Sequence, residues 1–232
     1  MQRLLIDGKK ILSGSITISG SKNATLPILA ATILNKKTTI SNIPFVNDIF
    51  TMIELLKFIG LRCKISKQKN SVEIINSKEN INTIAPYKLV KTMRAGILVL
   101  GPLIARYKKA KVSLPGGCAI GSRPVDLHLF ALKKLGAKIK IKNGYIFASA
   151  INGLTGAKIK FPSISVGATE NAILASVSAK GLTVLDNCAI EPEIKDLVDF
   201  LKKLGAKIKV YNRKIIIDGS ITQKKISHRV IC

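Results

Sequence analysis

One structural unit occurs three times along this chain. Each copy ends with an amphipathic helix, a glycine and a strand of alternating apolar and polar residues, and the three glycines are Gly60, Gly136 and Gly205. Glycine suits this place because it adopts the left-handed conformation that commonly ends a helix. The hydrophobic period changes from 3.6 to 2 residues directly after it. The unit recurs about every 70 residues, a period too long for most solenoids.

Each unit contains a second helix nearer its start, and this helix is apolar nearly all round. We expect these helices at 24–34, 90–106 and 168–180. Opening strands are expected at 14–19 and 156–161, joining strands at 38–41, 111–114 and 182–185, and returning strands at 71–75, 145–148 and 214–217. A helix without a polar face is buried. The sequence therefore predicts an α/β (α+β) domain with threefold pseudo-symmetry, helices inside and sheets outside.

The chain is strongly basic, with 38 Lys and Arg against 13 Asp and Glu and a formal net charge of +25. A polyanion such as nucleic acid is one partner that this charge would suit. The lysines, however, recur at solvent-facing places of helices and strands, and no aromatic residues alternate with them for base stacking. We therefore favour a compositional bias, and nucleic-acid binding stays as the weakest hypothesis.

The cysteines and the apolar segments indicate the compartment. The spacing of the four cysteines fits no zinc motif, and the start of the chain is too short in apolar residues for a signal peptide. The longest apolar run, 95–105, is far below the roughly 20 residues that cross a bilayer. We expect a cytoplasmic protein with reduced thiols, without membrane contact, metal or cofactor.

The second unit departs from its siblings in one loop. There it carries a glycine-rich insertion with Cys118 at its tip and Arg123 shortly after. Glycines permit unusual backbone conformations and movement, and a nearby cation lowers the pKa of a thiol and favours the thiolate. We predict that Cys118 is a reactive thiol, whereas Cys63 and Cys188 are interpreted as small apolar side chains. The last residue, Cys232, carries no signal.

Three further places could bind an anion. The run Ser19–Asn23 precedes a helix, where free N–H groups and the helix dipole favour an anion and Lys22 adds a full charge; an ordinary helix cap is the alternative. Arg94 stands within an apolar helix, where a charge needs an anionic ligand or a salt bridge. Ser165–Gly167 leads into the third unit's helix in a similar way, as a weaker signal.

Three titratable residues keep two interpretations each. Glu191 and Glu193 could act as acid or base groups, although carboxylates at the start of a helix are usually caps. His128 is expected at the start of a helix, where it either hydrogen-bonds to a ligand or is simply exposed.

The run from Pro115 to His128, P-G-G-C-A-I-G-S-R-P-V-D-L-H, resembles the signature loop of the UDP-N-acetylglucosamine 1-carboxyvinyltransferase family. The segments 19–24, 91–95, 165–169 and 191–194 match the same family in order, so the resemblance covers essentially the whole chain. The sister family that makes 5-enolpyruvylshikimate 3-phosphate shares the fold but lacks this loop.

The resemblance implies an inside-out α/β barrel domain of the enolpyruvyl transferase type, with three βαβαββ units. It implies that the enolpyruvyl group of phosphoenolpyruvate passes to the 3′-hydroxyl of UDP-N-acetylglucosamine with release of phosphate. This is the first committed step of peptidoglycan (cell wall) biosynthesis, and it needs no cofactor.

The resemblance also implies roles for individual residues. Cys118 would be the general acid toward the enolpyruvyl methylene, able to bond to phosphoenolpyruvate and to be alkylated by fosfomycin. Lys22 and Arg123 would hold the phosphate and carboxylate, supported by Arg94, and Asn23 would contact the reacting centre. A vinyl ether carbon needs a proton donor, and a dianion needs cations. The nucleotide-sugar site would be lined by Arg123, Pro124, Val125, Asp126, Leu127, His128, Ser165, Val166 and Gly167.

Two departures from the family matter. Ser163 stands where members often carry a Lys toward the nucleotide phosphates, and members run about twice as long. We expect residues 1–20 to be strands that belong to a second domain, 21–229 to be the three-repeat domain, and 230–232 to begin the crossover. The second domain would supply the Asp that acts as base on the sugar hydroxyl and several phosphate-binding arginines.

Two main hypotheses follow. The chain is either the working half of an enzyme, completed by a separately encoded carboxy-terminal half, or a truncated, catalytically inactive remnant that at most binds ligand. Release of phosphate from phosphoenolpyruvate in the presence of UDP-N-acetylglucosamine separates them. We also expect the isolated chain to expose an apolar docking face and to aggregate.

Overall fold

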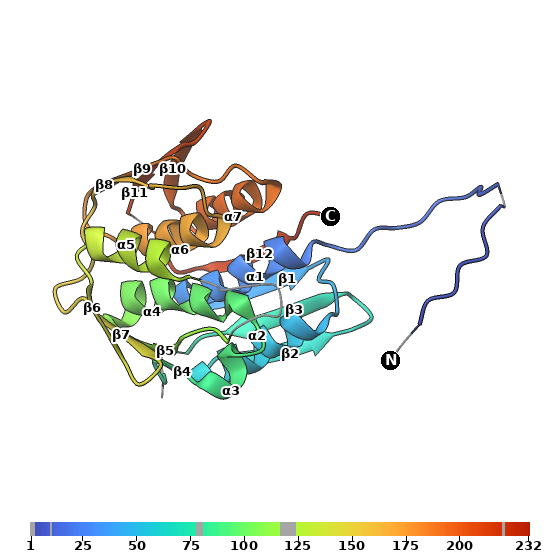
Figure 1. Cartoon of the computed structure of the whole chain (residues 1–232), viewed down its shortest axis with the longest axis horizontal. Coiled ribbons are helices and arrows are strands. Elements are labelled where there is room, and N and C mark those ends of the chain that lie inside the picture. The colour runs from blue at the N-terminus through green and yellow to red at the C-terminus, as the bar shows by residue number, and fades with distance from the viewer. Residues whose placement is uncertain (1–2, 10, 78–80, 117–123, 220) are drawn as a thin grey trace.

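The computed structural model describes residues 3–9, 11–77, 81–116, 124–219 and 221–232 (Figure 1). The described residues between 3 and 19 form an extended arm that leaves the body of the molecule and contains no strand. All of them are exposed. From Gly20 onward the described chain packs into one body that contains the three expected units.

The three units share one order of elements. The first contains α1 (Lys22–Ala31), the 3-10 helix η1 (Thr32–Leu34), β1 (Lys37–Ser41), α2 (Asn47–Ile59), β2 (Arg62–Ser66) and β3 (Ser71–Ile75). The second contains β4 (Ile84–Ala85), α3 (Tyr87–Val90), the 3-10 helix η2 (Arg94–Val99), α4 (Leu100–Tyr107), β5 (Lys109–Ser113), α5 (Asp126–Lys134), β6 (Lys138–Lys142) and β7 (Tyr145–Ser149). The third contains β8 (Lys158–Lys160), α6 (Val166–Ser176), β9 (Leu182–Asp186), α7 (Pro192–Lys203), β10 (Lys207–Tyr211) and β11 (Lys214–Asp218), and β12 (Lys225–Arg229) follows.

Each unit forms one four-stranded sheet of the same topology. The strand orders are β12-β1-β3-β2, β4-β5-β7-β6 and β8-β9-β11-β10. In every sheet the first pair is parallel and the other two pairs are antiparallel. The first unit takes its parallel edge strand from the end of the chain, where Lys225 of β12 pairs with Lys37 of β1. The described chain has no strand at 14–19, and β12 occupies the place that this opening strand would take in the first sheet. Pairing of this segment with a second domain stays a prediction.

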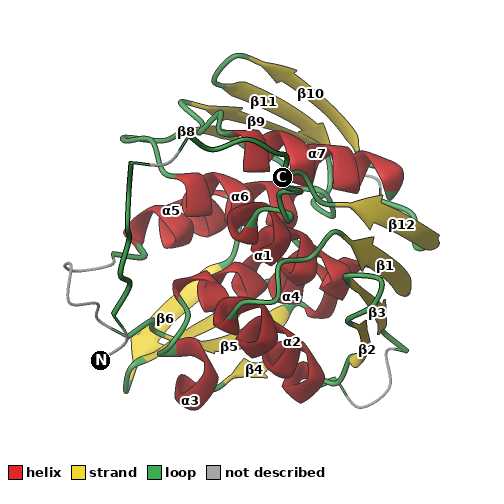
Figure 2. Cartoon of the chain, turned by 90° about the vertical axis from the view of Figure 1, so that its right-hand side faces the viewer, coloured by secondary structure: helices red, strands yellow, loops and turns green. Residues whose placement is uncertain are grey.

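The helices occupy the interior and the sheets lie outside, as Figure 2 shows. The inner helices α1, α4 and α6 are buried along most of their length, and α1 and α6 leave only their first turn exposed. The outer helices α2, α5 and α7 each keep an exposed face. The predicted inside-out arrangement is confirmed. Its physical reason is that a helix without a polar face is not stable at the surface.

The helix expected at 90–106 is wrong as a single element. The chain there forms α3, a turn, η2 and then α4, which begins at Leu100. Pro102 lies in the first turn of α4, where a proline removes no hydrogen bond of the helix and its ring meets no carbonyl of that helix. Arg94 consequently lies at the start of η2, where it is exposed, and not inside a buried helix. In the described ranges no helix is long and apolar enough to cross a membrane.

Candidate functional site

Six helices begin around one cleft of about 700 Å³. The residues that line it come from the first turns or the N-terminal flanks of these helices: Lys22 and Asn23 of α1, Asp48 of α2, Arg94 of η2, His128 of α5, Val166 and Gly167 of α6, and Glu193 of α7. The opposite ends of η1, α4 and α6 meet at a second cavity, lined by Leu34, Tyr107 and Ser178. The first N–H groups of a helix have no partner within it, and the helix dipole is positive there. The cleft is therefore built to attract an anion.

Two serines begin the inner helices of the first and third units in the same way. Ser21 Oγ accepts a hydrogen bond from the Ala24 N–H at 3.3 Å, and Ser165 Oγ accepts one from the Ala168 N–H at 3.3 Å. The two interpretations of these motifs, a helix cap and an anion site, are thus compatible. Each serine caps a helix whose first turn lines the cleft. The remaining N–H groups of each first turn stay available to a ligand.

Two cations of the cleft come from different units. Lys22 Nζ lies 2.8 Å from Asp48 Oδ2, and both side chains are partly exposed. Arg94 lines the same cleft, and it forms no ion pair with any carboxylate in the part of the chain that the structure describes. The salt bridge that was one of the two interpretations of Arg94 is therefore not found among the described residues. The charge of Arg94 faces the cleft.

His128 is buried, with 5% of its surface exposed. The expectation that it is simply exposed is wrong, because α5 turns its first residues inward against α6. Its Nδ1 lies 3.1 Å from Asn171 Nδ2. Burial lowers the pKa of His128 to about 4, with a further contribution from the charge of Arg94 and an opposing one from Asp126. The imidazole is therefore neutral at neutral pH.

Glu170 is a cleft residue that sequence reasoning missed. It lies in the second turn of α6, lines the cleft and has only 4% of its surface exposed. Burial raises the pKa of its carboxyl well above the usual value, and the charges of Glu193 and Glu191 raise it further. The signal was a charged residue within an apolar helix, the same signal that singled out Arg94. Glu170 thus places in the cleft a carboxyl whose surroundings favour its neutral form over the carboxylate.

The predicted residues of the glycine-rich loop are placed only in part. Cys118 and Arg123 lie outside the described residues. Before them, Gly116 packs so closely on the backbone of Lys91 that a Cβ at Gly116 would lie 2.7 Å from the Lys91 carbonyl oxygen. After them, Pro124, Val125, Asp126 and Leu127 precede or begin α5 next to His128, outside the cleft lining.

Cys63 and Cys188 have no activating environment. Burial raises the pKa of both the Cys63 and the Cys188 thiols to about 12. Cys188 is completely buried and Cys63 is partly buried on β2, so the interpretation as apolar side chains is confirmed. Within the described segments, no group of three or more His, Cys, Asp or Glu side chains could hold a metal ion.

Comparison with known proteins gives consistent matches. The profile of the family described as EPSP synthase (3-phosphoshikimate 1-carboxyvinyltransferase) matches residues 6–232. The chain is 58% identical over its full length to the UDP-N-acetylglucosamine 1-carboxyvinyltransferase of Pelagibacter ubique, covering 55% of that protein. It is 52% identical over its full length to the protein of the same name from Rickettsia bellii, covering 56% of it. The chain thus spans about half the length of these curated relatives.

Solved structures match in fold. The enolpyruvyl transferase NikO from Streptomyces tendae superposes with a TM-score of 0.78 at 19% identity, over 94% of this chain and 52% of that one. EPSP synthase from Acinetobacter baumannii superposes with a TM-score of 0.72 at 18% identity, over 93% of this chain and 49% of that one. At such low identity the likeness concerns the fold, and it agrees with the inside-out arrangement of helices and sheets.

Proposed function

Because this chain belongs to the EPSP synthase family of carboxyvinyl transferases, we propose that it is one half of an enzyme that transfers enolpyruvyl from phosphoenolpyruvate to the 3′-hydroxyl of UDP-N-acetylglucosamine. The observation that carries this proposal is the convergence of the matching motifs, far apart in the sequence, on one cleft of positive helix ends. The reaction would take place in the cytoplasm and serve peptidoglycan synthesis.

The anionic substrate would bind where the cations and the helix ends meet. Lys22 and Arg94 supply charge from two sides, and Asn23 is exposed at the start of α1 beside Lys22. The ion pair with Asp48 holds Lys22 in place and leaves two of its three ammonium protons for a ligand. Such an arrangement stabilises a phosphate or carboxylate and the charge that develops as phosphate leaves.

Cys118 and Arg123 would complete the catalytic group. Both flanks of their loop lie near the cleft, with Gly116 against Lys91 on one side and the start of α5 on the other. Cys118 would act as the general acid that protonates the enolpyruvyl methylene, and Arg123 would bind the phosphate together with Lys22. A proton donor is needed because the sugar oxygen bonds to the carbon that carries the phosphate. The methylene carbon at the other end of the double bond must then gain a proton.

The nucleotide sugar would bind on the side of the third unit. Ser165, Val166 and Gly167 expose the first turn of α6, and His128 lies beside them. Pro124, Val125, Asp126 and Leu127 would contact the same substrate from the loop. Ser163, which stands where relatives often carry a Lys, is exposed before α6 and lies outside the cleft lining.

The exposed arm would pair with a second domain that supplies the other wall of the cleft. Its apolar side chains have no cover within the described chain: Leu4, Leu5, Ile6, Ile11, Leu12, Ile16 and Ile18 are all more than half exposed. A row of uncovered apolar residues on extended backbone is a template for strand pairing. The domain that forms the carboxy-terminal half of the curated relatives is the partner that we propose.

The test is phosphate release from phosphoenolpyruvate with UDP-N-acetylglucosamine. The chain is assayed alone and after mixing with the carboxy-terminal half of the Pelagibacter ubique relative. We expect release only in the mixture, abolished by Cys118→Ser and retained by the matched control Cys63→Ser. Absence of release from the mixture, together with absence of UDP-N-acetylglucosamine binding by calorimetry, would overturn the proposed function.

The alternative is a catalytically inactive chain that only binds ligand. Binding of UDP-N-acetylglucosamine without release from the mixture would support this alternative. Nucleic-acid binding rests on the charge of +25 alone, and absence of salt-dependent DNA binding would exclude it.

A further inference from the structure

Asn171 on α6 forms hydrogen bonds with three neighbouring elements, α4, η2 and α5. It is completely buried in the middle of α6. Its Oδ1 accepts a hydrogen bond from the Gly101 N–H of α4 at 2.8 Å. Its Nδ2 lies 3.1 Å from the Ile97 carbonyl oxygen of η2 and 3.1 Å from Nδ1 of His128 on α5. Every polar atom of this side chain therefore has a partner.

The two backbone partners fix the orientation of the Asn171 amide. A backbone N–H can only donate and a backbone carbonyl can only accept. The amide oxygen must therefore face Gly101, and the NH2 group must face Ile97. The second proton of the NH2 group then points to His128 Nδ1, which accepts it. A neutral imidazole that accepts at Nδ1 carries its own proton on Nε2.

The surroundings keep the ring in this neutral form. Burial lowers the pKa of His128, and the titratable and charged groups around it are Arg94, which lowers the pKa further, and Asp126, which raises it. A doubly protonated ring would also direct a second N–H at the Asn171 NH2 group, where two donors would face one another. The hydrogen-bond geometry and the electrostatics thus favour the same protonation state.

The free edge of the ring lies at the start of α6. A Cβ on Gly167 would come within 3.2 Å of His128 Cε1 and 3.4 Å of Nε2, so the ring edge packs on the first turn of this helix. Both residues line the cleft, and Nε2 has no hydrogen-bond partner among the described residues. The Nε2–H group is placed beside the free N–H groups of the helix, where an acceptor oxygen would bind.

We propose that Asn171 is a positioning residue that holds His128 as the Nε2–H tautomer, so that the neutral ring donates a hydrogen bond to an acceptor oxygen of the cleft ligand. The identity of this ligand as the nucleotide sugar rests on the proposed function. The tautomer itself does not rest on it, because the contacts of Asn171 within the protein determine it.

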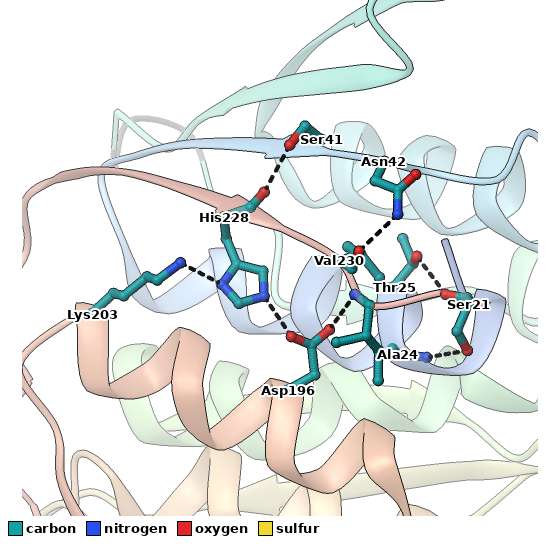
Figure 3. A network of polar contacts seen from close by, with 10 residues as sticks. Ser21, Ala24, Thr25, Ser41, Asn42, Asp196, Lys203, His228 and Val230 are labelled. Carbon is teal, nitrogen blue, oxygen red and sulfur yellow. Dashed lines mark hydrogen bonds and ion pairs between the residues drawn. The ribbon is translucent and has the colours of Figure 1, made fainter. Parts of the chain in front are cut away.

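The tautomer is directly measurable by long-range ¹H–¹⁵N correlation NMR on the unmodified chain. The chain has two histidines, and the other, His228, is an internal reference. Lys203 Nζ lies 3.1 Å from its Nδ1, and Asp196 Oδ1 lies 2.8 Å from its Nε2. Both contacts are drawn in Figure 3. An ammonium group only donates, so His228 is also expected as the Nε2–H form. Two histidines with a pyrrole-like Nε2 support the proposal, and a His128 protonated on Nδ1 overturns it.

Asn171→Asp tests the role of the amide. A carboxylate accepts from Nδ1–H, so we expect the variant to move the proton of His128 to Nδ1 while His228 keeps its signals. The matched control is Asn35→Asp, since Asn35 is likewise buried with its oxygen and nitrogen both bonded but does not contact His128. An unchanged His128 tautomer in folded Asn171→Asp would show that Asn171 does not position the ring.

A titration with UDP-N-acetylglucosamine tests the donor role. We expect the His128 Nε2 signal to shift on binding, and Asn171→Asp to weaken binding about tenfold or more, because a hydrogen bond to a charged oxygen is lost. Binding that leaves this signal unchanged overturns the donor role. Absence of any binding would count against the proposed function and would leave the tautomer result standing.

Discussion

Replacing Glu170 with Gln isolates the effect of one buried carboxyl on the pH dependence of folding. Gln has nearly the same shape and cannot ionise. Glu170 lines the cleft, and 4% of the residue's surface is exposed. Burial raises its pKa, and the charges of Glu193 and Glu191 raise it further. The folded chain therefore holds a proton that the unfolded chain releases at a lower pH.

The sign follows from this difference. The stabilising contribution of Glu170 is complete below the unfolded pKa of 4.5 and is lost as the pH rises toward the higher folded pKa. Within that window one bound proton changes the free energy of unfolding by up to about 1.4 kcal/mol per pH unit. For a chain of this size each kcal/mol corresponds to about 2–4 °C in Tm.

His128 acts in the opposite direction. Its pKa falls from 6.5 in the unfolded chain to about 4 in the folded chain. Its contribution is complete above pH 6.5 and is lost as the pH falls toward 4, by about 3 kcal/mol over the whole window. Above about pH 4.5 the two slopes oppose one another, because the Glu170 carboxyl loses its contribution while His128 gains its own. We therefore expect a shallow profile for the unmodified chain and, for Glu170→Gln, a stability that rises clearly with pH.

Urea unfolding followed by circular dichroism measures both profiles at half-unit pH steps. The matched control is Glu54→Gln on α2, an exposed Glu with a surface ion pair to Lys57. Such surface pairs contribute about 0–1 kcal/mol, so this variant should run parallel to the unmodified chain. Parallel profiles for Glu170→Gln and the unmodified chain would refute the assignment of a raised pKa to Glu170.

Three further predictions concern packing, reactivity and binding. Gly101→Ala should destabilise the chain by about 1–3 kcal/mol, because a Cβ there would overlap the facing α6 side chain and backbone; Gly8→Ala, with nothing within 4 Å, should leave the Tm unchanged. Iodoacetamide at pH 7.5 should alkylate Cys63 and Cys188 slowly, since burial raises the pKa of both thiols to about 12; rapid labelling of either, mapped by mass spectrometry, would contradict this. Lys22→Met should weaken phosphoenolpyruvate binding about tenfold or more through loss of a charge-assisted contact, and equal calorimetric affinities would exclude Lys22 from the anion site.

Local signals in the sequence predicted most of the fold. Gly60, Gly136 and Gly205 all have positive φ angles, of 110°, 92° and 92°, so the helix terminators are where the pattern placed them. The register of β12 was not predictable in this way. It pairs Lys225 with Lys37, and nothing near either residue in the sequence marks a partner so far away. Such pairings depend on closure of the whole three-unit ring.

The site was predictable where a motif marks it and not where tertiary packing defines it. Lys22 and Arg94 were found as cations and do meet in one cleft. The burial of His128 escaped prediction, because it results from α5 packing on α6 and not from the residues around it in the sequence. Glu170 and Asn171 were overlooked for a related reason. A polar residue within an apolar helix identifies either a binding group or an internal contact, and only the structure assigns Glu170 to the cleft and Asn171 to the contact.

The arm and the last residues of the chain leave the body beside the cleft, and this placement links the fold to the proposed partner. Asp196 Oδ1 lies 2.8 Å from Nε2 of His228 (Figure 3). Asp196 Oδ2 accepts a hydrogen bond from the Ile231 N–H at 3.2 Å. The Ile231 carbonyl in turn accepts from the Ser21 N–H at 2.7 Å, directly before α1. Lys22, which lines the cleft, is the next residue, so the arm leaves the body beside the cleft. The proposed second domain, paired with the arm, would therefore lie next to the cleft, where it would exclude water and strengthen the charge interactions of Lys22 and Arg94.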